Sequence, residues 1–267
     1  MQINLLGPMV VLGKTGPCYL RSRQVGALLA VLALSSGETR SPAALEQEFW
    51  PDQELKNTRN ALHATVSRLR RFLAEVGTKG EGVTLHSSGG RYRLDVPPGC
   101  VDALTFRSLV RQAETTLPSH PLQSLEYFEA GLALWSGPAL DDVASCTELR
   151  AEKVRLDELR LTALEGVAEA RLRLGHTRRV VGDLRHLVEI HGDRERLTEL
   201  LMLALYRSGQ QTEALDAFDR LRSRLNTEFG MYPSRSLRTI QQAILEQDRT
   251  LDLAVAFGQA TVSATRQ

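Results

Sequence analysis

The pattern of apolar residues changes at Pro97-Pro98-Gly99, and this change limits the folds that the chain can adopt. Before it, short alternating runs and turn residues surround three helical patterns; after it, helical patterns follow one another to about Asp248. A chain of 267 residues is long enough for two domains of ordinary size. We therefore predict an α+β domain over residues 1–98, an all-α domain over residues 99–250, and a flexible tail over residues 251–267.

The first 98 residues follow the order of strands, three helices and a hairpin. Short alternating runs around Ile3 and Val11 indicate antiparallel strands. Apolar residues at helical spacing predict three helices, which begin near Arg23, Pro42 and Asn57. Two strand patterns then flank Ser87-Ser88-Gly89-Gly90, which is a hairpin signal. This order is that of a winged helix-turn-helix domain.

Two glycines in the C-terminal part, Gly175 and Gly209, are 34 residues apart, which is the period of tetratricopeptide repeats. Ala214 and Phe218 follow the second glycine as the small and the aromatic residue that pack the two helices of such a repeat together. The corresponding pairs in two weaker units are Val180 with Leu184 and Ser124 with Phe128. The spacing predicts tetratricopeptide-like helices, and the alternative is an irregular helical bundle with two coincidentally spaced turns.

Composition and motifs argue against a membrane protein, a disulfide scaffold and an enzyme. No apolar run approaches the ~20 residues of a membrane span and no signal peptide is apparent, so we expect a cytoplasmic, nucleoid-associated protein with no membrane partner. The three cysteines are far apart and the six histidines form no metal-binding motif. Gly13-Lys14-Thr15 lacks the earlier glycine and the following helix of a phosphate-binding loop. We therefore expect no catalytic residues, no cofactor and no metal.

The formal net charge of +1 hides a difference between the two halves. Residues 1–98 contain 12 Lys and Arg against 8 Asp and Glu, whereas the rest of the chain contains 21 against 24. The opposite signs suggest two domains with different partners.

The helix predicted over residues 57–76 shows the most specific functional signal. Its apolar residues form one narrow stripe, and between Lys56 and Arg71 there are five basic residues and no acid. Such a helix suits the major groove of DNA, because Arg can fork onto guanine, Asn can pair with adenine, and small residues permit close approach. A solvated basic face is the alternative. The candidate base-reading residues are Asn60, His63, Ala64, Ser67, Arg68 and Arg71, and the candidate phosphate contacts on the flank are Lys56, Arg59 and Arg70.

The predicted hairpin adds two further candidates. Arg91 and Arg93 lie on one face of its second strand, beside the Gly89-Gly90 turn, within reach of phosphates or a narrow minor groove. Tyr92 and Leu94 lie on the opposite face, which we predict to be core.

Four motifs in order resemble the Streptomyces antibiotic regulatory protein family, and the resemblance extends from residue 1 to about residue 250. The motifs are Met1–Pro8, RNALHATVSRLRRF at residues 59–72, Gly89–Leu94, and LMLALYRSGQQTEALDA at residues 201–217 followed by Arg220-Leu221. The resemblance implies an OmpR-type winged helix joined to a bacterial transcriptional activation domain of tetratricopeptide-like helices. It also implies an activator of secondary-metabolite gene clusters that binds direct repeats near the −35 region of promoters.

The resemblance assigns roles to particular residues and names partners. The helix over residues 57–76 becomes the recognition helix, Arg91 the wing residue, and the preceding loop a candidate polymerase contact through Trp50, Asp52, Gln53 and Glu54. The implied partners are double-stranded promoter DNA, a second copy of the chain on DNA, and RNA polymerase holoenzyme through its sigma factor and the C-terminal domain of its alpha subunit. No receiver-domain pattern precedes the winged helix, so we expect no control through a phosphorylated receiver aspartate.

Two other functions stay open at this point. One is a repressor or architectural DNA-binding protein with the same winged helix but no polymerase contact. The other is an adaptor that holds a peptide or small molecule in its helical repeats.

Overall fold

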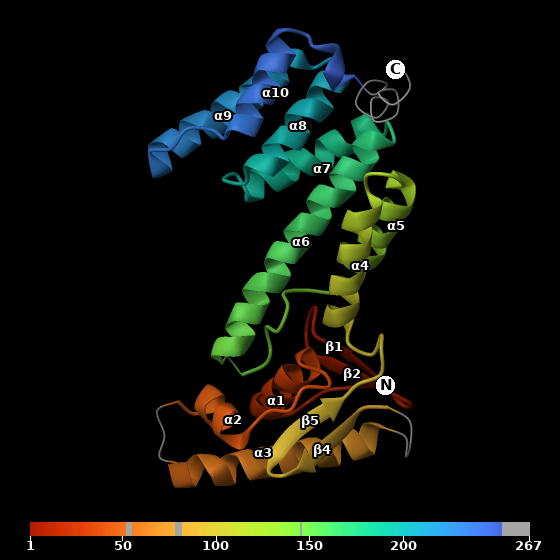
Figure 1. The fold of residues 1–267 in the computed structure, drawn as a ribbon, viewed down its shortest axis with the longest axis vertical. Helices are drawn as coiled ribbons and strands as arrows, with labels where there is room; N and C mark the ends of the chain where they lie inside the picture. The colour runs from red at the N-terminus through yellow and green to blue at the C-terminus, as the bar shows by residue number, and fades with distance from the viewer. Residues whose placement is uncertain (52–54, 78–81, 145, 253–267) are drawn as a thin grey trace, which may run out of the picture. The chain divides into compact units, whose positions relative to one another are not determined.

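A computed structural model of the chain describes residues 1–51, 55–77, 82–144 and 146–252 (Figure 1). The chain forms two compact units, Met1–Arg111 with Glu129–Leu161, and Gln112–Phe128 with the residues from Thr162 onward. A winged helix-turn-helix region is followed by helices alone, which confirms the predicted fold class. None of the helices built from the described residues combines the length and the hydropathy of a membrane span.

The N-terminal region contains the predicted elements in the predicted order. A three-stranded antiparallel sheet comes first, with the strands side by side in chain order. Three helices and an antiparallel hairpin follow it. The elements are β1 (Gln2–Asn4), β2 (Val10–Gly13), β3 (Gly16–Cys18), α1 (Arg23–Leu34), α2 (Pro42–Phe49), α3 (Leu55–Val76), β4 (Thr84–Ser88) and β5 (Arg91–Asp95).

The helices of this region differ in how much of their surface is buried. In α1 every residue from Val25 to Ala33 is buried, so this helix forms the centre of the core. Helix α3 buries a single stripe instead, and each fully buried Leu or Val of such a stripe stabilises the fold by about 1.5–3 kcal/mol. The stripe consists of Leu62, Val66, Leu69, Leu73 and Val76.

Two carboxylates from later in the chain bind the backbone of the loop between β1 and β2. Asp102, the first residue of α4 (Asp102–Thr116), is 3% exposed and accepts the N–H groups of Leu5 and Leu6 at 2.8–3.0 Å. Asp142 accepts the N–H of Met9 at 2.9 and 3.0 Å. Among the described residues, these loop N–H groups have no hydrogen-bond partner on a neighbouring strand. The two carboxylates accept their hydrogen bonds instead and so fix the loop within the first unit.

The remaining elements are helices, and short turns join those from α6 onward. They are α5 (Pro121–Leu132), α6 (Thr147–Arg173), α7 (Thr177–Ile190), α8 (Glu195–Arg207), α9 (Gln211–Phe229), α10 (Arg235–Leu245) and the short 3₁₀ helix η1 (Arg249–Leu251). Gly175 and Gly209 adopt positive φ angles of +79° and +78° in the turns before α7 and α9, a conformation that favours glycine. Every member of the three predicted packing pairs is buried: Ser124, Phe128, Val180, Leu184, Ala214 and Phe218.

Candidate nucleic-acid interface

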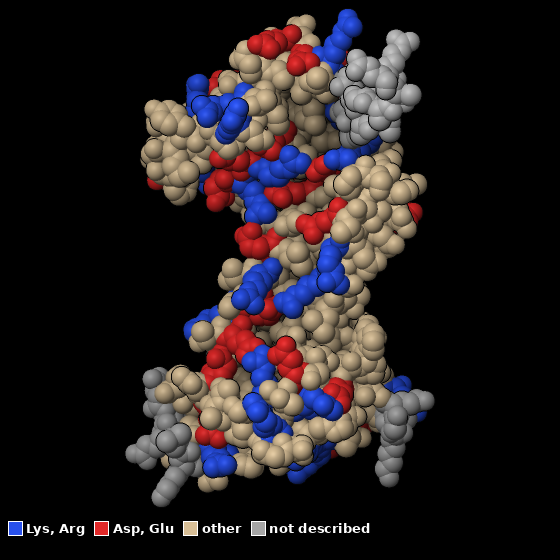
Figure 2. All heavy atoms as spheres, in the orientation of Figure 1, with Lys and Arg blue, Asp and Glu red and all other residues tan. Residues whose placement is uncertain are grey.

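Helix α3 separates an apolar stripe from an exposed polar face. All the base-reading candidates on this helix are exposed to solvent, as are two of the three flank candidates. These exposed residues are Arg59, Asn60, His63, Ala64, Ser67, Arg68, Arg70 and Arg71. The backbone of Lys56 belongs to α3, but its side chain lies outside the described part of the chain. Figure 2 shows Lys and Arg side chains along the edge of the winged-helix region that α3 forms in Figure 1.

The orientation of α3 is fixed by contacts on its buried side. The hydroxyl of Thr58, which is 2% exposed, donates to the carboxylate of Glu46 on α2 at 3.1 Å. Helix α2 itself begins as predicted, with the Ser41 hydroxyl accepting the N–H of Ala44 at 3.2 Å and Pro42 in the first helical position. The buried Leu45 adds an apolar side chain on α2. These contacts hold the two helices of the helix-turn-helix while the polar face of α3 stays open.

The hairpin forms a wing with a two-residue turn. Gly89 and Gly90 have φ angles of +57° and +75°, which a hairpin turn of this length requires and which glycine adopts without strain. Tyr92 and Leu94 are 5% and 0% exposed, which confirms that this face of β5 is core. Arg91 is exposed next to the turn, and no described carboxylate lies within ion-pair distance of it.

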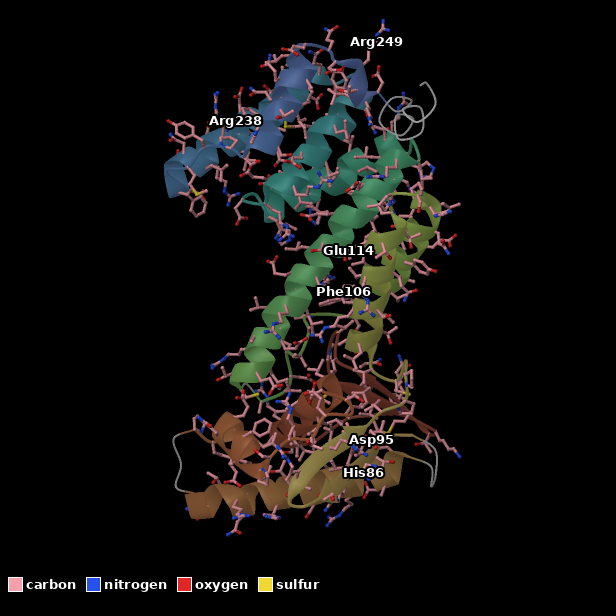
Figure 3. The ribbon with its side chains drawn as sticks, viewed as in Figure 1. His86, Asp95, Phe106, Glu114, Arg238 and Arg249 are labelled. Carbon is pink, nitrogen blue, oxygen red and sulfur yellow. The ribbon has the colours of Figure 1, made fainter. Side chains whose placement is uncertain are left out.

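Arg93 differs from Arg91 because it is already paired. Its Nε lies 2.8 Å from Asp95 Oδ1, and its Nη2 donates to Asp95 Oδ2 at 2.9 Å. His86 on β4 also approaches this carboxylate, with Nε2 3.1 Å from Oδ2, and Figure 3 labels the His86–Asp95 pair. The charge of Arg93 is therefore partly offset within the wing, whereas no carboxylate of the described residues offsets the charge of Arg91 in this way. A hydrogen bond from Arg70 to the Ser87 hydroxyl connects the flank of α3 to the same hairpin.

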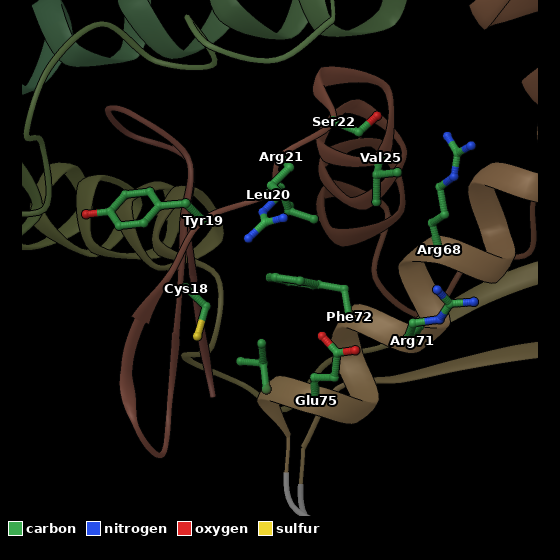
Figure 4. Close-up of a pocket in the computed structure, with 11 residues that line it drawn as sticks. Cys18, Tyr19, Leu20, Arg21, Ser22, Val25, Arg68, Arg71, Phe72 and Glu75 are labelled. Carbon is green, nitrogen blue, oxygen red and sulfur yellow. The ribbon is translucent and has the colours of Figure 1, made fainter.

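One basic residue near this face, Arg21, was not predicted as part of the site. It lines a hollow of about 610 Å³ together with Arg68 and Arg71 of α3, and Figure 4 shows its side chain projecting toward the ring of Phe72. Glu75 is the acidic residue of the same hollow. Arg21 directly precedes Ser22, the N-cap of α1, so a segment from before α1 and the C-terminal half of α3 together present three guanidinium groups.

The predicted polymerase loop is described only at its start. Trp50 is half-buried, and its ring meets Phe49 edge to face at 5.9 Å between centroids. Asp52, Gln53 and Glu54 lie outside the described residues.

Comparisons with known proteins place both regions in families of bacterial regulators. Residues 19–94 match the model described as "Transcriptional regulatory protein, C terminal", and residues 101–245 match "Bacterial transcriptional activator domain". The "Transcriptional regulator RedD" of Streptomyces coelicolor is 37% identical over 258 residues, covering 96% of this chain and 74% of RedD. The "Regulatory protein DnrI" of Streptomyces peucetius is 33% identical over 257 residues, covering 94% of each chain.

A solved structure has the same architecture. The structure titled "Mycobacterium tuberculosis EmbR in complex with low affinity phosphopeptide" superposes with a TM-score of 0.86 at 26% identity, covering 96% of this chain and 69% of that chain. Fold, interface and comparisons together define a DNA-binding transcriptional regulator with an OmpR-type winged helix and a bacterial transcriptional activation domain. The chain belongs to the Streptomyces antibiotic regulatory protein family.

Proposed function

We propose that this regulator activates an antibiotic gene cluster by binding direct repeats near the −35 region of its promoters and recruiting RNA polymerase. The observation that carries the proposal is the exposed face of α3, which has no acidic residue from Arg59 to Arg71. Arg91 of the wing borders this face and has no ion pair with a described carboxylate. This face spans about 18 Å at 1.5 Å per residue. That length corresponds to about five base pairs at 3.4 Å each.

The side chains on this face divide by the contacts that their chemistry favours. Arg68 and Arg71 suit the O6 and N7 atoms of guanine, and Asn60 suits the edge of adenine. Ala64 and Ser67 leave room for the backbone of α3 to approach the groove, and His63 lies beside them. Arg59, Arg70 and Lys56, together with Arg91 and Arg93 of the wing, then supply phosphate contacts that set the position of the protein along the DNA.

The helical region provides the second part of the proposal. We assign residues 1–98 to DNA binding and residues 99–250 to contacts with a second protomer on the adjacent repeat and with the polymerase. The candidate polymerase surfaces are the sigma factor and the C-terminal domain of the alpha subunit. On the regulator's side, the loop of Trp50, Asp52, Gln53 and Glu54 is the candidate contact. The support is the match of residues 101–245 to the transcriptional activator domain.

Binding of variants to a selected DNA sequence and to random DNA tests the assignment of α3. Arg68→Ala or Arg71→Ala is expected to cost ~1–3 kcal/mol on the selected sequence and to relax specificity at one position. Arg91→Ala is expected to weaken binding to both DNAs alike and to reduce the salt dependence. Arg220→Ala, an exposed residue of α9, serves as the matched control and is expected to change neither. Equal losses on both DNAs for all three interface variants would contradict base reading.

Transcription in vitro from a promoter that contains the selected sequence separates an activator from a repressor or an architectural protein. The proposal predicts a higher transcript yield when the regulator is added to the polymerase holoenzyme. An unchanged or lower yield at saturating regulator would contradict it.

A further inference from the structure

A second basic hollow lies within the helical unit, at the turn between α6 and α7. It has a volume of about 610 Å³ and is here named the turn pocket. Its lining residues come from the turn, from the first residues of α7 and from the end of α8, and they include no Asp or Glu. They are Gly175, His176, Thr177, Arg178, Arg179, Arg207 and Ser208.

Arg178, Arg179 and Arg207 of the turn pocket have no described carboxylate within ion-pair distance, whereas seven other arginines of the same unit do. Arg178 and Arg179 are exposed in the first turn of α7, and no described carboxylate lies within ion-pair distance of either. Elsewhere in the unit, ion pairs join Arg171 to Asp183, Arg173 to Glu169, Arg185 to Glu213, Arg194 to Glu165 and Arg196 to both Glu169 and Glu199. Arg178 and Arg179 therefore carry positive charge that no described carboxylate offsets at ion-pair distance, a property that they share with Arg220 and Arg238 of the same unit.

Arg207 is held at the pocket by neutral groups. Its Nε donates to the carbonyl of Leu251 at 2.7 Å, and its Nη1 donates to the carbonyl of Leu172 at 3.2 Å. Burial lowers the pKa of Arg207, and Asp252 acts in the opposite direction. Its guanidinium is thus fixed and partly removed from water, and a bound anion would stabilise its charge.

Further hydrogen-bond donors point to the same chemistry. The Ser208 hydroxyl oxygen is buried and has no hydrogen-bond partner among the described residues. Helix α7 has 14 residues, its N-cap His176 makes no capping hydrogen bond with its side chain, and no acidic residue occupies its first turn. The first backbone N–H groups of α7 therefore add a positive potential to the pocket.

We propose that the turn pocket binds a small molecule that carries a diphosphate or triphosphate group. Guanidinium groups and the free backbone N–H groups at the start of α7 match phosphate oxygens. The volume lies in the range of small-molecule sites and exceeds what a single orthophosphate needs. Residues 253–267 contain no Asp or Glu, so their side chains cannot supply the anion. A ligand at this place contacts the start of α7 and the end of α8 and so stabilises the helical unit.

Calorimetric titration of the full chain with pyrophosphate tests the proposal, with orthophosphate and citrate as comparison ligands. We expect one pyrophosphate site per chain, at least tenfold weaker binding of orthophosphate, and no binding of citrate at the same concentrations. The double variant Arg178→Gln/Arg179→Gln is expected to weaken pyrophosphate binding at least tenfold. The double variant Arg220→Gln/Arg238→Gln removes the same charge from exposed positions on α9 and α10 and is expected to bind as the wild type does.

Several results would overturn the proposal. These are no pyrophosphate binding at millimolar concentration, equal binding of citrate, or an equal effect of the two double variants. Because Arg178 and Arg179 are exposed, their replacement should leave the unfolding midpoint of the unliganded chain unchanged, which thermal unfolding checks. Binding to the selected DNA is measured in parallel and should be the same for both double variants. A loss of DNA affinity confined to Arg178→Gln/Arg179→Gln would assign the pocket to DNA phosphates instead.

Discussion

Replacement of Asp102 by alanine is expected to destabilise the first compact unit by about 2–4 kcal/mol. The carboxylate accepts the backbone N–H groups of Leu5 and Leu6, and these two amides have no other acceptor among the described residues. A buried donor left without a partner costs about 1–3 kcal/mol, which gives roughly 2–6 kcal/mol for two. Burial raises the pKa of Asp102, although hydrogen bonds from Leu6, Leu5 and Ala103 lower it, so the wild type already bears a desolvation cost that alanine removes. The lower part of the range is therefore expected.

Urea unfolding of the full chain, followed by tryptophan fluorescence, measures this effect. The chain has two tryptophans, Trp50 and Trp135, and both belong to the first unit, so the signal reports on that unit. Asp141→Ala is the control, because Asp141 is exposed and its one ion pair among the described residues is with Lys153 at the surface. Asp102→Asn keeps one acceptor oxygen and should fall between alanine and wild type. The reasoning is refuted if Asp102→Ala and Asp141→Ala lose the same stability within about 0.5 kcal/mol, the usual effect of surface substitutions.

Three further predictions concern charge and reactivity. Burial raises the pKa of Glu169, but the arginines bonded to it lower that pKa overall. The stability that Glu169 contributes is therefore present above its ordinary pKa of 4.5 and lost as the pH falls below it. Unfolding followed by circular dichroism at several pH values should show that Glu169→Gln reduces this loss of stability at acidic pH, here called the acid limb. Burial raises the pKa of the Cys146 thiol to about 11, with Glu48 acting in the same direction, so a thiol reagent at pH 8 should label it at least tenfold more slowly than the other two cysteines. Arg91→Ala should reduce by about 1 the magnitude of the slope of log K for DNA binding against log salt concentration, and Arg93→Ala should reduce it by less.

Each of these predictions has an outcome that contradicts it. An acid limb that is unchanged in Glu169→Gln would show that its ion pairs do not govern stability at low pH. Labelling of all three cysteines at one rate in the folded chain would contradict the burial of Cys146. A larger effect of Arg93→Ala than of Arg91→Ala would show that the pair with Asp95 does not limit the contact of Arg93 with DNA.

The elements of the fold were predictable where the sequence has a clear local period. The stripe of α3, the Gly89-Gly90 turn and the buried pairs after Gly175 and Gly209 all follow from spacing within one or two elements. The pairing of Arg93 with Asp95 also has a local signal, because residues two apart on a strand share a face.

The contacts that join distant segments could not be predicted in this way. Asp102 binds Leu5, which is 97 positions earlier, and Asp142 binds Met9 across 133 positions, with no pattern that relates the partners. Arg21 lies beside α3 only because the segment before α1 folds against it. Such contacts depend on tertiary packing, and a single sequence contains no periodic pattern that reveals which distant segments pack together.

Selection of bound fragments from random DNA by the full-length protein at physiological salt tests the central claim most directly. We predict enrichment of two copies of one short motif, in the same orientation and at a fixed spacing, because one α3 face reads a few base pairs and paired protomers read two such sites. Recovery of fragments with no enriched motif would contradict sequence-specific recognition and reduce the arginine face of α3 to general phosphate binding.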